Sequence, residues 1–121
     1  MGHYAYELHK ATTTMNKENF DEVLVKIKEE VSKDKWKGYG WRDAVLNAET
    51  FEEALEEFGI LLEYEGNGNY RPVINDVYVS NFFGSLTHIV APYMTDGEIQ
   101  VEDDYGVVDI IFEDGKALIR Y

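Results

Sequence analysis

Residues 60–79 read ILLEYEGNGNYRPVINDVYV and contain the strongest fold signal in the chain. Apolar and aromatic residues predict a strand from Ile60 to Glu65 and a return strand from Tyr70 to Val79. Between them, Gly66-Asn67-Gly68-Asn69 is typical of a tight turn, because glycine and asparagine tolerate a positive φ. Pro72 has no backbone N–H, so the return strand should be interrupted or confined to a sheet edge. The sequence therefore predicts a β-hairpin.

Working outward toward the N-terminus, three further elements are predicted. Alternating large and polar residues indicate a strand over 4–10, and Asn16 is a suitable cap for a helix over 17–33. That helix has one apolar stripe, spaced three and four residues apart: Phe20, Val23, Leu24, Ile27 and Val31. Thr50 and Glu53 form a capping-box pattern that opens a short helix through Phe58, which Gly59 terminates. Its buried side is predicted to be Phe51, Ala54, Leu55 and Phe58.

Toward the C-terminus, Ser80 or Asn81 can cap a helix that runs to about residue 90 and ends before Pro92. His88 lies in the middle of that helix and is expected to be partly buried. Three strands follow, over 98–102, 107–113 and 116–121, and Asp114-Gly115 suits a two-residue hairpin turn. The predicted order is β-α-α-β-β-α-β-β-β. We expect a single α+β domain over residues 1–121, with a mainly antiparallel sheet and helices packed on one face.

The segment Trp36-Lys37-Gly38-Tyr39-Gly40-Trp41-Arg42 alternates large aromatic residues with glycines and bases, and it is expected to be a loop. Three interpretations are considered. Trp36 and Trp41 can anchor a protein partner, since tryptophan, tyrosine and arginine dominate interface energetics. The aromatic residues beside bases can also stack nucleic-acid bases, which the acidic remainder of the chain disfavours. Alternatively, both tryptophans cover the core.

Charge is distributed unevenly along the 121 residues. Residues 1–48 contain eight acids and eight bases, whereas residues 49–121 contain sixteen acids and three bases, which accounts for the whole net charge of −13. A field of this sign repels nucleic acid and anionic membranes and attracts basic protein surfaces. We therefore expect a basic protein partner and no direct binding to nucleic acid or membrane; the oligomeric state stays open.

Two clusters supply the candidate binding residues. Because the apolar residues of the helix over 51–58 face inward, its glutamates should form an exposed ridge. A second group lies on the predicted strands near the C-terminus. The candidate partner-binding residues are Glu49, Glu52, Glu53, Glu56, Glu57, Glu102, Asp103, Asp104 and Asp109, with Trp36 and Trp41 as apolar anchors.

Recognisable catalytic and cofactor motifs are absent from the sequence. There is no cysteine, which excludes disulfides, thiolate metal sites and a cysteine nucleophile. The histidines lack zinc-ligand spacing, the run 102–104 lacks the spaced ligands of an EF-hand, and no glycine-rich segment ends as a phosphate loop does. No basic-then-apolar leader or long apolar run is present, so we expect a soluble, cytoplasmic protein without enzyme activity, cofactor or metal.

A resemblance to known proteins lies in the C-terminal third of the chain. It is carried by the run Leu86-Thr87-His88-Ile89-Val90-Ala91-Pro92-Tyr93, by an Asp-Gly turn with an acidic strand, and by Ile111-Phe112-Glu113-Asp114-Gly115-Lys116. This part of the chain resembles the C-terminal half of small acidic proteins from phages and mobile elements of bacteria, a set that includes anti-restriction and anti-CRISPR inhibitors. The resemblance covers about 35 residues and transfers no catalytic motif. It implies a protein that works in the cytoplasm of a bacterial host.

Charge and resemblance together favour a non-enzymatic inhibitor of a nucleic-acid-handling protein, such as a nuclease or a CRISPR or restriction effector. Its carboxylates would occupy the basic groove that normally takes DNA, which presents about one charge per 1.7 Å of axis. An immunity protein that neutralises a cognate toxin nuclease is an alternative, and a plain oligomerisation or scaffold domain is another. The inhibitor hypothesis requires the acidic clusters to converge on one face.

Overall fold

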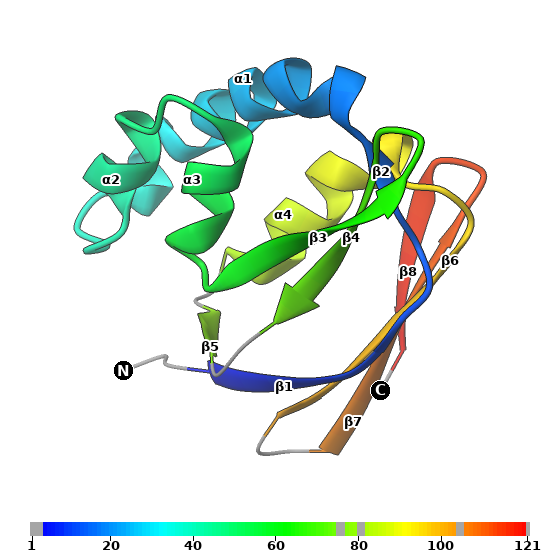
Figure 1. Cartoon of the computed structure of the whole chain (residues 1–121). Helices are drawn as coiled ribbons and strands as arrows, with labels where there is room; N and C mark the ends of the chain where they lie inside the picture. Colours follow the sequence, from blue (N-terminus) through cyan, green and yellow to red (C-terminus); the bar gives the residue numbers. More distant parts are fainter. Residues whose placement is uncertain (1–3, 75–76, 80–81, 104–105, 121) are drawn as a thin grey trace.

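The computed structural model describes residues 4–74, 77–79, 82–103 and 106–120, which form two antiparallel sheets and four α-helices (Figure 1). The α+β class with antiparallel pairing is confirmed. One sheet was expected, but the strands divide into a five-stranded sheet of order β5-β1-β6-β7-β8 and a three-stranded sheet of order β2-β4-β3.

The five-stranded sheet contains β1 (Tyr4–Ala11), β5 (Val77–Val79), β6 (Gly97–Asp103), β7 (Gly106–Glu113) and β8 (Lys116–Arg120). Its last three strands form the predicted meander. Asp114 and Gly115 have φ angles of 52° and 74° at the turn between β7 and β8, which confirms the two-residue hairpin. Alternation along β6 and β7 points Ile99, Val101 and Ile110 into the core and leaves Glu98 and Asp109 on the opposite face.

The three-stranded sheet contains the predicted hairpin. Strand β3 (Ile60–Gly66) pairs with β4 (Asn69–Ile74) across Asn67-Gly68, and both turn residues have a positive φ. The short strand β2 (Met15–Asn16) pairs with β4 at Asn69 and Tyr70, and Met15 also forms an isolated bridge with Met94. Pro72 therefore lies on a part of β4 that has no strand paired on that side among the described residues, as its missing N–H requires.

The helices are α1 (Phe20–Val31), α2 (Arg42–Leu46), α3 (Phe51–Glu56) and α4 (Phe83–Val90), with short 3₁₀ turns at Lys17–Asn19, Asp34–Trp36 and Ala91–Tyr93. The Asn16 side chain accepts a hydrogen bond from the Glu18 N–H, which confirms it as a cap, although a 3₁₀ turn precedes α1. Helix α4 ends immediately before the 3₁₀ turn that contains Pro92. The predicted caps Ser80 and Asn81 lie outside the described residues.

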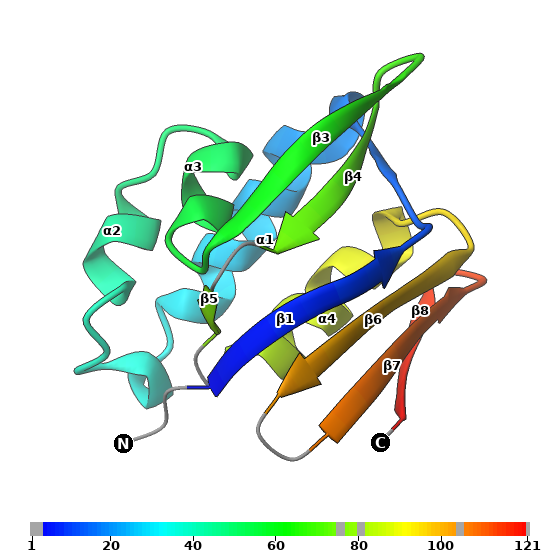
Figure 2. The ribbon, with the colours of Figure 1, turned by 60° about the horizontal axis from the view of Figure 1, so that its bottom comes forward.

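One core joins all these layers. Figure 2 shows the two sheets side by side, with α1 and α4 behind them and α2 and α3 to one side. The predicted inner faces of α1 and α3 are all buried, and they pack with Phe82 and Leu86 and with the inner face of β6 and β7. The opposite face of the five-stranded sheet is free of helices in both views.

Three expectations about the fold are wrong. The return strand does not continue to Val79, because residues 77–79 leave the hairpin as β5 and pair with β1. Residues 42–46 were not predicted as a helix but form α2. His88 is exposed, because Thr87 takes the buried position beside it. The Thr87 hydroxyl donates a hydrogen bond to the Phe83 carbonyl, 2.9 Å away.

Candidate partner-binding surface

The outer side of α3 carries a cluster of exposed glutamates. Phe51, Ala54 and Leu55 face the core, which leaves every glutamate of this short helix exposed. We call the exposed carboxylates Glu49, Glu52, Glu53, Glu56 and Glu57 the α3 ridge. The ridge thus follows directly from the apolar spacing of the sequence.

Local hydrogen bonds fix the start of this helix. The Thr50 hydroxyl accepts a hydrogen bond from the Glu53 N–H at 3.1 Å, as the capping pattern predicts. The Glu53 carboxylate accepts from the N–H of Glu49 at 3.0 Å rather than from that of Thr50. Glu53 is therefore partly occupied in holding the helix, whereas the other four ridge carboxylates accept no such hydrogen bond from the described residues.

No ridge carboxylate forms an ion pair within 4.0 Å of a base among the residues that the structure describes. Two bases on neighbouring helices, Lys28 and Arg42, donate to backbone carbonyls instead. Lys28 Nζ donates to the Ala48 carbonyl at 2.5 Å, and Arg42 donates to the carbonyls of Val31 and Ser32 at the end of α1. The negative charge of the ridge is thus left uncompensated.

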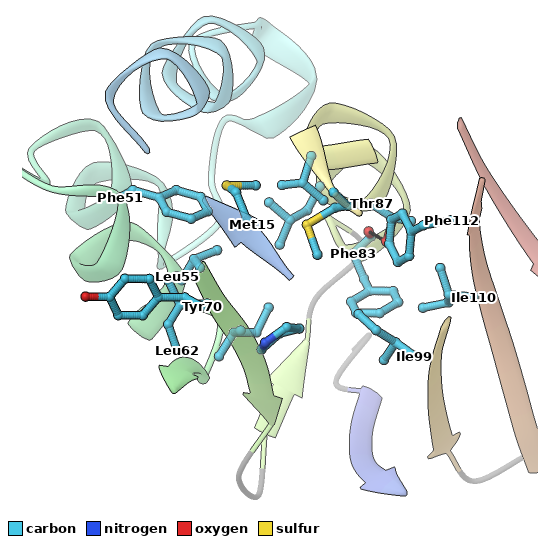
Figure 3. A pocket seen from close by; sticks show the side chains of 15 residues that line it. Met15, Phe51, Leu55, Leu62, Tyr70, Phe83, Thr87, Ile99, Ile110 and Phe112 are labelled. Atoms are coloured by element: carbon cyan, nitrogen blue, oxygen red, sulfur yellow. Dashed lines mark hydrogen bonds between the residues drawn. The ribbon is translucent and has the colours of Figure 1, made fainter. Parts of the chain in front are cut away.

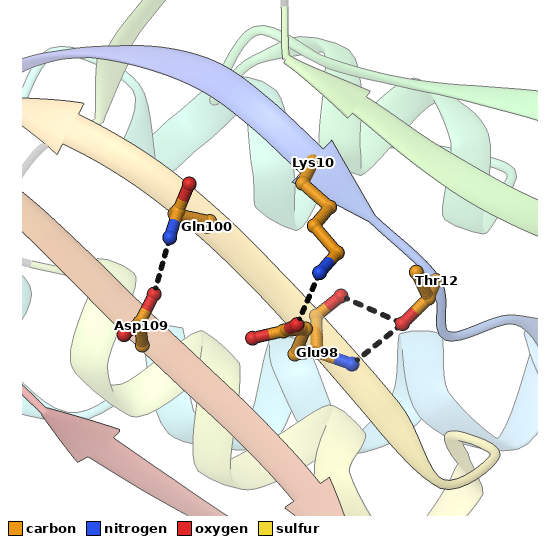
Figure 4. Close-up of polar contacts among 5 residues, drawn as sticks. All are labelled: Lys10, Thr12, Glu98, Gln100 and Asp109. Atoms are coloured by element: carbon orange, nitrogen blue, oxygen red, sulfur yellow. Dashed lines mark hydrogen bonds and ion pairs between the residues drawn. The ribbon is translucent and has the colours of Figure 1, made fainter.

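The second group of acids lies on the outer face of the five-stranded sheet and is largely paired. Lys10 Nζ lies 2.6 Å from a Glu98 carboxylate oxygen, and the Gln100 side-chain amide donates to Asp109 at 2.8 Å (Figure 4). The Lys10 pair raises the pKa of that ammonium group, first through the hydrogen bond to Glu98. Glu102 is 2.8 Å from the His9 ring nitrogen Nε2.

The two acidic groups do not merge into one patch. In both views α3 lies beside α2, while β6 and β7 lie on the other side of β1 (Figures 1 and 2). Glu102 and Asp109 are therefore separated from the α3 ridge. Asp104 lies outside the described residues, as does the side chain of Asp103. The expected convergence of all these carboxylates is not found among the described residues, because their elements belong to different layers.

Trp36 is a core residue and not an exposed anchor. It is only 6% exposed, and its ring contacts Phe82 edge-on at a centroid distance of 4.9 Å. The core interpretation is thus confirmed for Trp36. Trp41 is half-buried and packs against Phe58 at 5.1 Å, and its indole Nε1 has no hydrogen-bond partner among the described residues. Its role as an anchor stays a prediction.

Glu30 connects Trp36 to α1 and should make stability depend on pH. Its carboxylate accepts from Trp36 Nε1 at 2.9 Å and lies 2.8 Å and 3.1 Å from the Lys33 and Lys35 ammonium groups. These contacts, Lys33 first and Trp36 second, lower the pKa of Glu30 from 4.5 to about 2. A depressed pKa stabilises the folded state above pH 4.5, and this contribution is lost as the pH falls through 2.

We expect Glu30 to contribute about 1 kcal/mol to the free energy of unfolding at pH 5, because both lysine partners are well exposed and solvent screens them. Urea unfolding at pH 5 and pH 2 measures this. The Glu30→Gln variant should lose stability at pH 5 and approach the unmodified protein at pH 2. An equal deficit at both pH values would show that the carboxylate charge does not matter.

No group of three or more metal-ligating side chains occurs within the ranges 4–74, 77–79, 82–103 and 106–120. Among the same residues, no helix is long and apolar enough to cross a membrane. No protein-family model, curated protein or solved structure matches the chain. The resemblance to small acidic phage proteins therefore stays a prediction.

Proposed function

We propose that this protein is a non-enzymatic inhibitor that occupies the basic groove of a nucleic-acid-handling protein with its α3 ridge. The observation that carries the proposal is the exposure of five ridge carboxylates without an ion-paired base among the described residues. The acids on the outer sheet face differ, since Lys10, His9 and Gln100 already contact them.

The physics of the interaction is the reverse of DNA binding. A nuclease or a CRISPR or restriction effector holds DNA with arginines and lysines, and counterions leave when the charges meet. A carboxylate ridge on a folded helix supplies negative charge to such a groove without a phosphodiester bond that can be cut. The net charge of −13 steers the encounter, so association should be fast and should weaken as salt is added.

The proposal uses a smaller surface than the sequence suggested. Helix α3 has only six residues, fewer than two turns, so the ridge is short and other contacts must contribute to the affinity. Trp41 belongs to the turn that starts α2, the helix next to α3, and it is half-buried. We propose that its exposed edge contributes apolar contact beside the ridge, as tryptophan does in many interfaces.

The test is an inhibition assay with matched variants. A ridge variant, Glu49→Gln with Glu52→Gln, Glu56→Gln and Glu57→Gln, removes four charges and keeps the capping residue Glu53. The control removes four exposed charges from the region of α1: Glu18→Gln, Asp21→Asn, Glu29→Gln and Asp34→Asn. Both variants change the net charge equally, so they separate the ridge from the overall field.

DNA cleavage by restriction and CRISPR nucleases is measured with increasing protein, and plaque formation by phage is measured on hosts that carry the same systems. We expect the ridge variant to need at least tenfold more protein for half-inhibition, a loss of about 1.4 kcal/mol, and the control to change less than threefold. Equal losses of inhibition in both variants would show that overall net charge, and not the ridge, determines the effect. An affinity that is the same at low and high salt would contradict binding by charge mimicry.

The same surface would serve an immunity protein, and inhibition confined to a toxin nuclease encoded beside this chain would assign it to that class. Inhibition of no nuclease, together with concentration-dependent association in sedimentation, would favour the scaffold alternative.

A further inference from the structure

A partly enclosed pocket lies where the two sheets, α3 and α4 meet (Figure 3). Side chains from distant parts of the chain line it, including Met15 of β2, Leu55 of α3, Leu62 of β3, Leu86 of α4 and Ile99 of β6. The pocket is separate from the α3 ridge, which lies on the opposite side of the same helix. Phe51 and Leu55 face the pocket, while the neighbouring glutamates face solvent.

The lining offers almost nothing to a polar molecule. Carbon and sulfur atoms make up nearly all of its exposed surface. The hydroxyl of Thr87, one of the few polar groups in the lining, already donates to the Phe83 carbonyl at 2.9 Å. A buried water normally makes about three hydrogen bonds, so water gains little in this pocket. The chemistry of the lining therefore favours an apolar occupant.

The size of the pocket limits that occupant. The cavity volume is about 60 Å³. This is more than a single water needs, whereas an apolar cavity of roughly 150 Å³ takes up benzene, so a ring fills this pocket only if the side chains at its rim give way. The pocket therefore suits nothing larger than a six-membered ring or a short alkyl chain, and it excludes a drug-sized ligand.

The rim of the pocket is adaptable. Leu62, Phe83 and Met94 are only half-buried, whereas Leu86 and Ile99 at its base are buried. The two methionines of the lining, Met15 and Met94, have unbranched and flexible side chains that can move to admit a small molecule. A ligand can therefore enter past these half-buried side chains without unfolding the core.

We propose that this pocket binds one small, uncharged apolar molecule, no larger than a benzene ring or a short alkyl chain. The proposal does not depend on the inhibitor function, because the pocket and the ridge have no residue in common. Burial of apolar surface from both ligand and lining drives the binding.

Benzene is the probe for the test, with the full-length protein labelled at its isoleucine and leucine methyl groups. We expect saturable NMR shifts confined to methyls of the pocket, with intermolecular NOEs to Leu86, Ile99 and Ile110. An absence of saturable shifts up to the solubility of benzene would overturn the proposal, as would NOEs only to exposed residues such as Leu118.

Two neighbouring leucines of β3 provide a matched pair of variants. Leu62→Phe places a larger side chain at the rim of the pocket, whereas Leu61→Phe adds the same atoms at a residue that is 43% exposed and does not line it. We expect the dissociation constant of benzene to rise at least tenfold in Leu62→Phe and less than twofold in Leu61→Phe. Equal effects of the two substitutions would contradict binding in this pocket. If Leu62→Phe does not fold, the NOEs in the unmodified protein decide the question.

Discussion

Replacing Phe82 with alanine should lower the free energy of unfolding by about 3–5 kcal/mol, the largest effect we expect from a single substitution. Phe82 is fully buried. Its ring stacks on Phe58 at a centroid distance of 5.1 Å and an interplanar angle of 12°, and it contacts both tryptophans. Alanine would remove these contacts together and leave a cavity that the surrounding rings cannot fill.

Urea unfolding followed by tryptophan fluorescence measures the loss, because Trp36 and Trp41 lie against the substituted ring. Tyr64→Ala is the control, since Tyr64 is 59% exposed and contacts only the neighbouring Tyr70 ring among the described aromatic residues. We expect that control to cost less than about 1 kcal/mol. A loss below about 1 kcal/mol in Phe82→Ala would contradict the idea that contacts among these rings stabilise the core.

The same aromatic cluster shows why the role of the tryptophans could not be decided from the sequence. The residues around Trp36 and Trp41 alternate with glycine and lysine, a pattern that fits a binding loop and a core cover equally well. Trp36 packs against Phe82, which lies 46 residues further along the chain, and Phe82 in turn stacks on Phe58. Contacts over such separations leave no local pattern.

Elements held by local chemistry were predicted well. The β3–β4 hairpin depends on two residues with a positive φ, and the start of α3 depends on Thr50 and Glu53 three residues apart. Residues 77–79 were predicted as part of the return strand and not as the separate strand β5, because their partner β1 is more than 70 residues away in the chain. Helix α2 was missed because it is short and its N-cap, Trp41, makes no side-chain capping bond.

For the candidate site, too, the parts that depend on local sequence were predicted and the parts that depend on distant contacts were not. The α3 ridge was predicted because apolar spacing within one helix determines which residues face solvent. The convergence of that ridge with Glu102 and Asp109 depended on how separate layers pack, and the structure places them apart. The apolar pocket was not foreseen, because residues from both sheets and two helices line it and each is an ordinary core residue in its own segment.

The second large effect on stability is expected from a substitution at Gly97, the first residue of β6. There the threonine segment, Thr12 to Thr14, lies against the start of the strand. Thr12 N–H donates to the Glu98 carbonyl at 2.8 Å, and the Glu98 N–H donates to the Thr12 hydroxyl at 2.9 Å. The buried Thr13 hydroxyl donates to the Thr95 carbonyl at 2.5 Å. These bonds hold the backbone of residues 12–14 tightly against residues 95–98.

A methyl group on residue 97 would not fit this arrangement. The added carbon would lie 3.0 Å from the Thr12 carbonyl carbon and 3.0 Å from the Thr13 nitrogen, both backbone atoms that cannot rotate away. Gly97→Ala must therefore separate the two segments and weaken the bonds between them. We expect a loss of about 1–3 kcal/mol in the free energy of unfolding, as for overpacking of a well-fitted core.

Gly84 provides the matched control, because it lies inside α4 and an added methyl would meet no atom within 4 Å among the described residues outside its own helical turn. Gly84→Ala should raise stability by up to about 1 kcal/mol, since alanine is the better helix former. Chemical denaturation of the two variants under identical conditions measures the contrast. The argument fails if Gly97→Ala is as stable as the unmodified protein, because the threonine segment would then be free to move away from β6. Hydrogen exchange at the amides of Thr12 and Glu98 locates the effect: both should exchange faster in Gly97→Ala and be unchanged in Gly84→Ala.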